Sequence, residues 1–496
     1  MKKIALFAFF ILSVVPASHA QVPVSGVGYF QPGYAYRHML NPAFVPMYGY
    51  VGIPVAGNAD FRLGSNMGLA DFLYPMPDGS LGTFMHPEVD ADAFLKRMHR
   101  RNYIGMDFNS MLLSGAWFSG KSFWNVHAAV RGIFQMGLPY ELFEFAKRGM
   151  YRNPTRYKME DIEMAFKSYI ELAVGYARPV TDEITVGGKF KFLLGLVEAE
   201  LRMDKVDASM GDDVWKLNST ADFRIFGRLL ECDWPQDESL PAFSFGDVGL
   251  SGFGAAVDVG GEYRPSFLPG LRFSLSLLDL GFIGYPRNSI QQYSASGETD
   301  FDGFEDLGPD VDWRGQLQDA ADGLLSLADF EEAAVDKSMA RMINPSLNIG
   351  AEYAVWNNRF SVGLLNTTTF YHSYTENELS LIANLRPVRW FSFSLAYSFF
   401  GLANGLGWAL NFTPDVGLNV FIASNYTPLE VNPQFIPLRR AHLDLQFGMV
   451  VPLTRNRPQV SGRDPMDVNI YPYGPSASRQ SANKVKNKRN IKKIKL

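Results

Sequence analysis

The stretch "WFSFSLAYSFF", residues 390–400, alternates between large apolar and small side chains. One set of alternate positions holds Phe391, Phe393, Leu395, Tyr397 and Phe399, and the other holds Ser392, Ser394, Ala396 and Ser398. Successive side chains of a β-strand point to opposite faces, so this stretch predicts a strand with one apolar and one polar face. Its length of about ten residues is enough to cross a bilayer at a tilt.

The same alternation recurs along most of the chain. We place crossings near 49–66, 103–119, 122–137, 167–180, 183–196, 245–264, 270–284, 343–356, 358–371, 376–387, 390–402, 404–414, 416–426 and 440–453, with another candidate at 214–227. These runs are longer than the five or six residues that are usual for strands in soluble proteins. They predict an all-β fold, a transmembrane antiparallel β-barrel of about 14 strands (range 12–16). A large soluble β protein is the alternative.

The connections between these runs alternate in length. Short turns are expected at 119–121, 179–182, 265–270, 357–358, 387–388 and 414–415, and long connections at 67–102, 138–166, 197–244, 285–342 and 427–439. Tight turns on one side and large loops on the other are typical of outer-membrane barrels, whose short turns are periplasmic. Fourteen crossings require that 197–244 extends a loop or contributes an even number of strands.

The first segment, "MKKIALFAFFILSVVPASHA", has a basic start, a short apolar core and a small-residue end. This pattern predicts that residues 1–20 are a cleaved signal peptide. No later window approaches eighteen consecutive apolar residues, so no membrane helix is expected. The one cysteine, Cys232, excludes an internal disulfide. The predicted location is therefore the outer membrane, in contact with its lipid and lipopolysaccharide.

The charge is unevenly distributed. Residues 454–496 hold eleven Lys or Arg and two Asp, whereas residues 21–453 hold 33 basic and 49 acidic side chains. The basic segment is poor in apolar residues and predicts a disordered periplasmic tail. It would attract an anionic periplasmic polymer or an acidic envelope protein, or serve only as a solubilising tail. Nucleic acid is not an expected partner of an exported chain.

Residues 21–48 precede the first crossing and contain much of the broken stretch "NPAFVPMYGY", residues 41–50. Pro42 and Pro46 cannot donate to a sheet ladder, and Asn41 is pushed toward extended geometry by the proline after it. A barrel of fourteen strands is wide enough for water unless something fills it. We therefore predict that 21–48 forms an N-terminal hatch or plug inside a barrel of residues 49–453. The junction motif would be Asn41, Pro42, Ala43, Phe44 and Pro46, and the alternative is a rigid lead-in to the first strand.

The polar faces of the predicted strands carry charges of both signs. If the apolar faces meet lipid, the lumen receives Asp107, His127, Arg131, Glu171, Lys189, Lys191, Asp258, Glu262, Arg264, Arg272, Glu352, Arg386, His442 and Asp444. One interpretation is a lattice of ion pairs that fills a narrow barrel. The other is a polar track for a solute.

The longest connection, 285–342, is acidic. Its residues 298–336 include thirteen Asp or Glu and one Arg, and apolar residues between 317 and 330 recur at helical intervals. They predict an amphipathic helix over or inside the barrel mouth, with similar short helices at 91–100 and 140–149. The span "DFDGFED", residues 300–306, could bind calcium on the surface, but it lacks the terminal Glu spacing of a helix-loop-helix site.

Signals for catalysis are poor. His442 and Asp444 share a face, yet the chain has no G-x-S-x-G elbow and no organised triad spacing. With one Cys and seven His, no metal-ligand cluster stands out. The sequence therefore predicts no enzyme, no cofactor and no metal site. An outer-membrane hydrolase is the weaker alternative.

Three short motifs resemble a known family. "LNPAFVP" (40–46), "YGYVGIP" (48–54) and "LSLLDLGFIGY" (275–285) resemble a family of uncharacterised outer-membrane β-barrels from Bacteroidota-type bacteria (DUF5723-like). The resemblance implies a barrel of about fourteen strands with an N-terminal segment in the lumen, and it implies no catalytic residue. Asn-Pro-Ala also recurs in the family of long-chain fatty-acid outer-membrane transporters. "NPAF" is similar to openings of barrels linked to gliding and type IX secretion.

Two functions follow from these observations. The first is an outer-membrane barrel that binds or passes a small, hydrophobic solute, with the N-terminal segment as hatch. The second is a structural or assembly barrel, whose loops and basic tail hold other components of the envelope or of a secretion machinery.

Overall fold

The computed structural model describes residues 26–453 apart from 77–80, 151–154, 211–214, 234–241, 247–248, 302–326, 357, 371–374, 389, 401–402, 415–416 and 428–441. The described chain forms a closed antiparallel β-barrel of 14 strands, as the alternation predicts. Among the described residues, no helix is long and apolar enough to cross a membrane. The predicted signal peptide (1–20), the first residues of the predicted plug (21–25) and the predicted disordered tail (454–496) lie outside the described residues.

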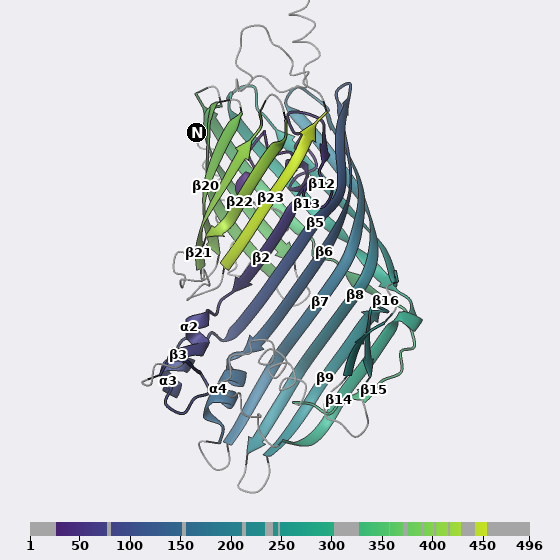
Figure 1. Ribbon diagram of the computed structural model, residues 1–496, viewed down its shortest axis with the longest axis vertical. Helices are drawn as coiled ribbons and strands as arrows, with labels where there is room; N and C mark the ends of the chain where they lie inside the picture. The colour runs from purple at the N-terminus through teal and green to yellow at the C-terminus, as the bar shows by residue number, and fades with distance from the viewer. Residues whose placement is uncertain are drawn as a thin grey trace, which may run out of the picture.

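The barrel strands follow one another around the wall in chain order (Figure 1). Their bounds are β5 Arg101–Ser119, β6 Ser122–Pro139, β7 Thr155–Pro179, β8 Ile184–Met210, β12 Gly252–Tyr263, β13 Leu271–Tyr285, β17 Ser346–Val355, β18 Phe360–Phe370, β19 Thr375–Val388, β20 Phe391–Phe400, β21 Ala403–Phe412, β22 Asn419–Thr427 and β23 His442–Pro452. The fourteenth crossing is made of β1 (Tyr50–Gly52) and β2 (Ala59–Ser65). Both parts pair with β5 on one side and with β23 on the other, which closes the barrel.

The outer surface of the wall is apolar. On β12, Phe253, Val257 and Val259 are 54%, 42% and 52% exposed, while the alternate residues Ala256 and Asp258 are buried. Exposed apolar faces outside and polar faces inside reverse the pattern of a soluble barrel, and they are stable where lipid surrounds the wall. The tight turns lie together at one end, which we call the short-turn end, uppermost in Figure 1. The closed wall and its lipid-facing surface are those of an outer-membrane barrel.

Two strands extend far beyond the membrane at the opposite end. β7 begins at Thr155 and β8 ends at Met210, so strands occupy much of the predicted connections 138–166 and 197–244, although neither region adds a crossing to the barrel. The first half of β8 pairs with β12, and its second half pairs with β9 (Trp215–Gly227). The candidate crossing at 214–227 therefore forms a strand, but this strand lies in an outward extension of the sheet.

The extension continues into the region predicted as a long acidic loop. β14 (Ile290–Phe301) pairs with β9 and with β15 (Glu331–Glu332), and β16 (Met339–Met342) pairs with β13. Residues 285–342 thus include three strands rather than a continuous loop. Most of the helix predicted over 317–330, and most of the calcium candidate 300–306, lie outside the described residues.

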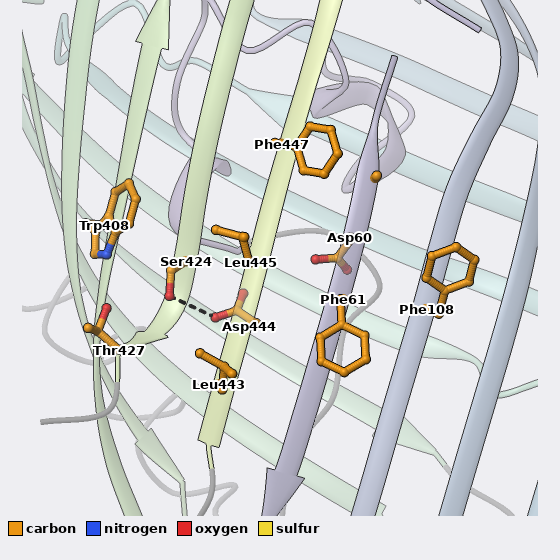
Figure 2. Close-up of a pocket in the computed structure, with 11 residues that line it drawn as sticks. Asp60, Phe61, Phe108, Trp408, Ser424, Thr427, Leu443, Asp444, Leu445 and Phe447 are labelled. Carbon is orange, nitrogen blue, oxygen red and sulfur yellow. Dashed lines mark hydrogen bonds between the residues drawn. The ribbon is translucent and has the colours of Figure 1, made fainter. Parts of the chain in front are cut away.

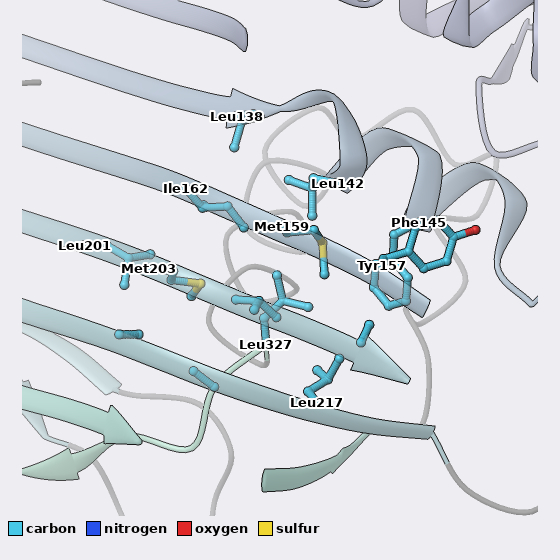
Figure 3. Close-up of a cluster of buried hydrophobic side chains, with 14 of the residues drawn as sticks. Leu138, Leu142, Phe145, Tyr157, Met159, Ile162, Leu201, Met203, Leu217 and Leu327 are labelled. Atoms are coloured by element: carbon cyan, nitrogen blue, oxygen red, sulfur yellow. The ribbon is translucent and has the colours of Figure 1, made fainter. Parts of the chain in front are cut away.

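One face of the extension is covered by a second hydrophobic core, the outer core (Figure 3). Its covering elements are α2 (Leu69–Phe72), α3 (Ala91–Leu95), α4 (Tyr140–Arg148) and the hairpin of β3 (Leu73–Pro75) and β4 (Leu81–Thr83). The helices predicted at 91–100 and 140–149 are thus present. Leu327, Ala328 and Phe330 are buried in this core without helical structure.

The remaining elements are short. β10 (Leu230–Asp233) and β11 (Ala242–Phe245) form a separate hairpin. Three 3₁₀ turns, η1 (Gly26–Gly28), η2 (Arg37–Met39) and η3 (Arg287–Ser289), complete the described structure, and the first two lie in the segment before β1.

Candidate solute site in the lumen and wall

Residues 26–48, which we call the plug segment, are surrounded by the barrel wall. Tyr29, Tyr36, Leu40 and Phe44 are no more than 2% exposed. The segment makes hydrogen bonds to many of the surrounding strands. They include Tyr29 Oη to Ser274 Oγ (3.1 Å), Gln31 Nε2 to Ser394 Oγ (2.6 Å), Tyr36 Oη with Ser114 Oγ (2.7 Å), Ser276 Oγ to the Leu40 carbonyl (2.8 Å) and Gln446 Nε2 to Tyr34 Oη (2.7 Å). Partners on β5, β13, β20 and β23 place the segment inside the lumen.

The Asn-Pro-Ala motif packs against glycines of β8 and β12. A Cβ atom at Gly187 would lie 2.2 Å from the Pro42 carbonyl oxygen, and one at Gly260 would lie 2.1 Å from Asn41 Oδ1. We call Gly187 and Gly260, which are direct neighbours in the β8–β12 ladder, the glycine seat. A side chain at either position would force a shift in the contact between the plug segment and the wall.

Asn41 ties the motif to the wall and to itself. Its Nδ2 donates to the carbonyls of Gly261 (3.3 Å) and Leu275 (3.2 Å), while its Oδ1 accepts from the Ala43 amide (2.9 Å). The other predicted junction residues, Pro42, Phe44 and Pro46, are buried with it. The motif therefore makes specific contacts rather than serving only as a stiff linker.

Six buried side chains on the wall beside the plug form what we call the buried ion network. Its members are His127, Arg131, Glu171, Lys191, Asp258 and Asp279. Arg131 reaches Glu171 at 2.9 Å and Asp279 at 3.0 Å, and Lys191 reaches Asp258 at 2.9 Å. His127 Nε2 lies 2.7 Å from Glu171 Oε1. Lys189, also buried, stands opposite Asp258 in the β8–β12 ladder. Three carboxylates thus share this wall with at least three cations.

Asp279 reaches the network through a β-bulge that alternation could not predict. Val257 pairs with Leu280 and Val259 with Leu277, so Leu278 and Asp279 stand together opposite Asp258. Asp279 has a φ of 58°, and its amide donates to Asp258 Oδ1 at 2.8 Å. The extra residue shifts the inward-facing register of β13 by one position, which turns Asp279 into the lumen.

A second group of predicted residues is paired near the short-turn end. Arg272 and Arg386 both contact Glu352, at 3.0 Å and 3.3 Å. Arg386 also donates to the Phe30 carbonyl of the plug segment at 2.9 Å. Glu262 is paired with the half-buried Arg264. These contacts link the plug segment to the wall electrostatically.

The last three predicted residues, Asp107, His442 and Asp444, lie on the other side of the lumen. Arg62 of β2 stands between Asp107 of β5 and Asp444 of β23 in the ladders. Asp60 and Arg62 are each 2% exposed, and neither is among the residues predicted from the sequence. They alternate with the apolar residues Phe61 and Leu63 along β2. This alternation was the sequence signal that could have identified them as lumen-facing.

Several buried polar atoms on this side of the lumen lack a hydrogen bond. Arg62 Nε and Nη1, Asp60 Oδ1 and Asp444 Oδ2 are buried without a hydrogen-bond partner among the described residues. The Arg62 guanidinium lies 5.5 Å from the centre of the Tyr426 ring. The Tyr426 hydroxyl donates to Glu378 at 2.6 Å, so a further carboxylate lies behind it.

The wall itself opens here, between β22 and β23. Their ladder runs from Asn419, opposite Val450, to Ala423, opposite Gln446, and no pair of Ser424–Thr427 with β23 follows. Beyond this point the side chain of Asp444, on β23, accepts hydrogen bonds from β22 in place of backbone ladder bonds. Its Oδ1 accepts from the Tyr426 amide at 2.7 Å and from Ser424 Oγ at 3.3 Å.

A cavity of about 410 Å³ lies at this opening, and we call it the seam cleft (Figure 2). It is lined by Ala59, Asp60, Phe61, Phe108, Trp408, Ser424, Thr427, Leu443, Asp444, Leu445 and Phe447. Phe61, Phe108, Leu445 and Phe447 are 43–47% exposed on the lipid-facing surface. The cleft therefore has apolar walls that continue into the outer surface and two carboxylate residues in its lining.

Two smaller cavities follow within the barrel. One, of about 40 Å³, shares Asp60 and Phe108 with the seam cleft and is also lined by Arg131 and Asp279. The next, of about 50 Å³, shares Ile133 and Asn344 with it and reaches Arg341. The seam cleft and the two smaller cavities are therefore neighbours that share lining residues. In the described part of the chain, no three His, Cys, Asp or Glu side chains gather as a metal site.

The chain belongs to a family described as "Family of unknown function (DUF5723)", whose model matches residues 42–425. The resemblance of the three short motifs is thereby confirmed. No curated protein matches this chain.

Solved structures similar to this chain include a FadL homologue, a toluene transporter and a monoaromatic hydrocarbon channel. A FadL homologue of Pseudomonas aeruginosa has 11% identity, a TM-score of 0.37, and coverage of 88% of this chain and 97% of its own. The toluene transporter TbuX of Ralstonia pickettii has 8% identity, a TM-score of 0.38, and coverage of 88% and 94%. The monoaromatic hydrocarbon channel CymD has 9% identity, a TM-score of 0.32, and coverage of 89% and 98%. The strand pairing above, rather than these similarities, establishes the fold.

Proposed function

We propose that this protein binds a small hydrophobic solute in the seam cleft and passes it between the outer membrane and the barrel lumen, without catalysis. The observation that carries the proposal is the early end of the β22–β23 ladder, with a cavity of about 410 Å³ at the opening. Small-molecule sites occupy about 300–1,000 Å³ and are mostly apolar with few polar groups. The seam cleft fits this description.

The plug segment would act as a hatch in this proposal. It fills the lumen on the short-turn side of the cavities, so a solute that enters from the seam cleft cannot continue unless the segment shifts. Its contacts are hydrogen bonds and side-chain packing rather than ladder pairing, and such contacts can be exchanged without breaking the wall. Release of the Asn-Pro-Ala motif from the glycine seat would be the opening step.

A cross-link across the seam tests the proposal. Thr427→Cys and Leu443→Cys place thiols on the two strands that border the cleft, in a Cys232→Ala background that removes the native thiol. Joining the pair with a short bifunctional thiol reagent should abolish binding of a small aromatic solute such as 4-phenylbutanol. The same protein before cross-linking should bind it, as measured by equilibrium dialysis in lipid nanodiscs.

The matched control lies on the same two strands. Val420 and Met449 are ladder partners at the end of the strands that stays paired. Cross-linking Val420→Cys with Met449→Cys should leave solute binding unchanged. Equal binding by both cross-linked proteins would contradict a site at the seam.

A second function, an assembly barrel in the envelope, is favoured by a different observation. The extension of β7, β8, β9 and β14 carries its own outer core beyond the membrane, which solute passage does not require. A folded outer platform could hold envelope or secretion components, and the basic tail could bind an anionic polymer on the periplasmic side. Cross-linked pull-down from native membranes, with and without residues 455–496, would identify such partners. An unchanged set of partners would exclude the tail from this role.

A further inference from the structure

The charges beside the seam cleft do not balance. Within the described residues, which leave out the 428–441 connection, Asp60, Asp107 and Asp444 are grouped around one cation, Arg62, whose ladder partners are Asp107 and Asp444. The next cation, Arg131, lies across the adjoining small cavity beside Asp107 and is already paired with Glu171 and Asp279. The lining of the cleft includes Asp60 and Asp444 but not Arg62. A ligand in the cleft therefore meets negative groups first.

Both carboxylates have an oxygen in need of a partner. Asp60 and Asp444 are 2% and 1% exposed, and Asp60 Oδ1 and Asp444 Oδ2 have no hydrogen-bond partner in the described chain. An uncompensated buried carboxylate is costly, and a cation or a hydrogen-bond donor that reaches it recovers much of that cost. Glu171 and Asp258 of the buried ion network also have an oxygen without a hydrogen bond. Each carboxylate of that network nevertheless contacts Arg131 or Lys191, whereas Asp60 and Asp444 form no ion pair among the described residues.

The rest of the lining indicates which kind of ligand skeleton the cleft would bind. Phe61, Phe108 and Trp408 provide aromatic surfaces, and Leu443, Leu445 and Phe447 provide further apolar ones. Such walls bury an aromatic or alkyl skeleton and also attract an ammonium group to the ring faces. The side that opens toward lipid admits a molecule that partitions into the membrane.

We propose that the solute of the seam cleft is a hydrophobic amine, whose protonated nitrogen is held by Asp60 and Asp444 and whose apolar body lies against the aromatic lining. This inference rests on the proposed function and adds the chemical class of the solute. Fatty acids and other anionic amphiphiles are disfavoured, because their carboxylate would face Asp60 and Asp444. Neutral alcohols should bind with intermediate affinity, since a hydroxyl can donate a hydrogen bond to either carboxylate.

Three probes with one skeleton test the inference. 4-Phenylbutylamine, 4-phenylbutanol and 4-phenylbutyrate differ in the head group alone, and at pH 7 they are cationic, neutral and anionic. Equilibrium dialysis of the full chain in neutral-lipid nanodiscs would give their dissociation constants, corrected by empty nanodiscs. The amine should bind about ten- to hundredfold more tightly than the butyrate, the range that a charge-assisted hydrogen bond contributes. This comparison requires no variant.

The variant Asp60→Asn with Asp444→Asn keeps the side-chain shape and removes both charges. In this variant the dissociation constant of the amine should rise to that of the alcohol. The dissociation constant of the alcohol should change by no more than about twofold, because a neutral head group loses little when the charges are removed. Glu183→Gln, which removes one charge from a short turn far from the cleft, should leave all three constants unchanged.

The outcomes separate the two levels of the proposal. Equal or tighter binding of the butyrate, or amine preference that survives in the double variant, would overturn the inference while leaving a solute site in place. Failure of all three probes to bind would contradict the proposed function and this inference together.

Discussion

The two sides of the lumen treat buried charge in opposite ways. On the β8–β12 side the ladder is continuous, the plug segment rests on the glycine seat, and the carboxylates of the buried ion network contact cations. On the β22–β23 side the ladder stops after Ala423, a cavity reaches the lipid-facing surface, and Asp60 and Asp444 form no ion pair among the described residues.

This difference separates structural charge from charge that is available to a ligand. A polar lumen face by itself does not distinguish them, since both sides are buried and rich in carboxylates. What distinguishes them is whether the partner groups are supplied by the wall. On the β8–β12 side each carboxylate of the buried ion network contacts a cation of the wall, whereas Asp60 and Asp444 on the β22–β23 side form no ion pair among the described residues. The following substitutions test this contrast, from the largest expected effect to the smallest.

Glu171→Gln should be the most damaging change. Glu171 contacts Arg131 at 2.9 Å and His127 at 2.7 Å, and breaking a buried ion pair leaves an uncompensated charge. The free energy of unfolding should fall by about 3–5 kcal/mol. Urea titration in lipid vesicles, followed by tryptophan fluorescence, would measure the loss.

The corresponding change on the other side is Asp60→Asn. It removes a buried charge whose Oδ1 has no hydrogen-bond partner, so the free energy of unfolding should stay the same or rise. If Asp60→Asn were as destabilising as Glu171→Gln, the two sides would not differ in the way described.

Gly187→Ala should disturb the plug segment with an intermediate effect. The added Cβ would lie 2.2 Å from the Pro42 carbonyl oxygen, a backbone atom that cannot move aside as a flexible side chain could. Overpacking of this kind costs about 1–3 kcal/mol, so the undocked population should rise by about 5- to 150-fold. Thiol labelling of Ala35→Cys, in a Cys232→Ala background, would report the undocked segment.

Gly188→Ala is the control next to it in the sequence. Its added Cβ would lie 3.6 Å from the Asp258 carbonyl oxygen, an ordinary van der Waals contact. Labelling of Ala35→Cys should stay at the level of the parent protein. Comparable labelling in both variants would indicate that the glycine seat does not hold the plug segment.

The smallest effect concerns a single hydrogen bond of the plug segment. Tyr36 Oη and Ser114 Oγ lie 2.7 Å apart. A double-mutant cycle of Tyr36→Phe and Ser114→Ala should give a coupling energy of about 0.5–1.5 kcal/mol, measured by urea titration. In a Gly187→Ala background the coupling should decrease, because the undocked segment no longer makes this contact. Unchanged coupling there would mean that the segment stays docked near β5.

The barrel could be predicted from the sequence because lipid imposes a period of two on each crossing. Stretches such as residues 390–400 and 440–453 correspond to β20 and β23 with small shifts at the ends. The length of β7 and β8 could not be predicted. Their alternation continues outside the membrane, where their apolar side chains pack in the outer core instead of facing lipid. Alternation indicates a strand, but it does not indicate what the strand packs against.

The site was predictable only in part. Eleven of the fourteen predicted lumen residues are buried, including Glu171, Lys191 and Asp444. Asp279 was missed because a bulge turns it inward out of phase with its neighbours on β13. The divergence of β22 from β23 could not be predicted either, since it concerns the pairing of two strands. Each strand alone keeps an ordinary pattern, and the pairing emerges only in the closed wall.

Photoaffinity labelling tests the central claim most directly. A diazirine derivative of 4-phenylbutylamine, photolysed with the full chain in nanodiscs and mapped by peptide mass spectrometry, reports where the solute lies. The account predicts labels on residues 59–61, 424–427 and 443–447, which are suppressed by excess unlabelled amine. Competable labels confined to the outer core, or to residues of the β8–β12 side, would contradict it.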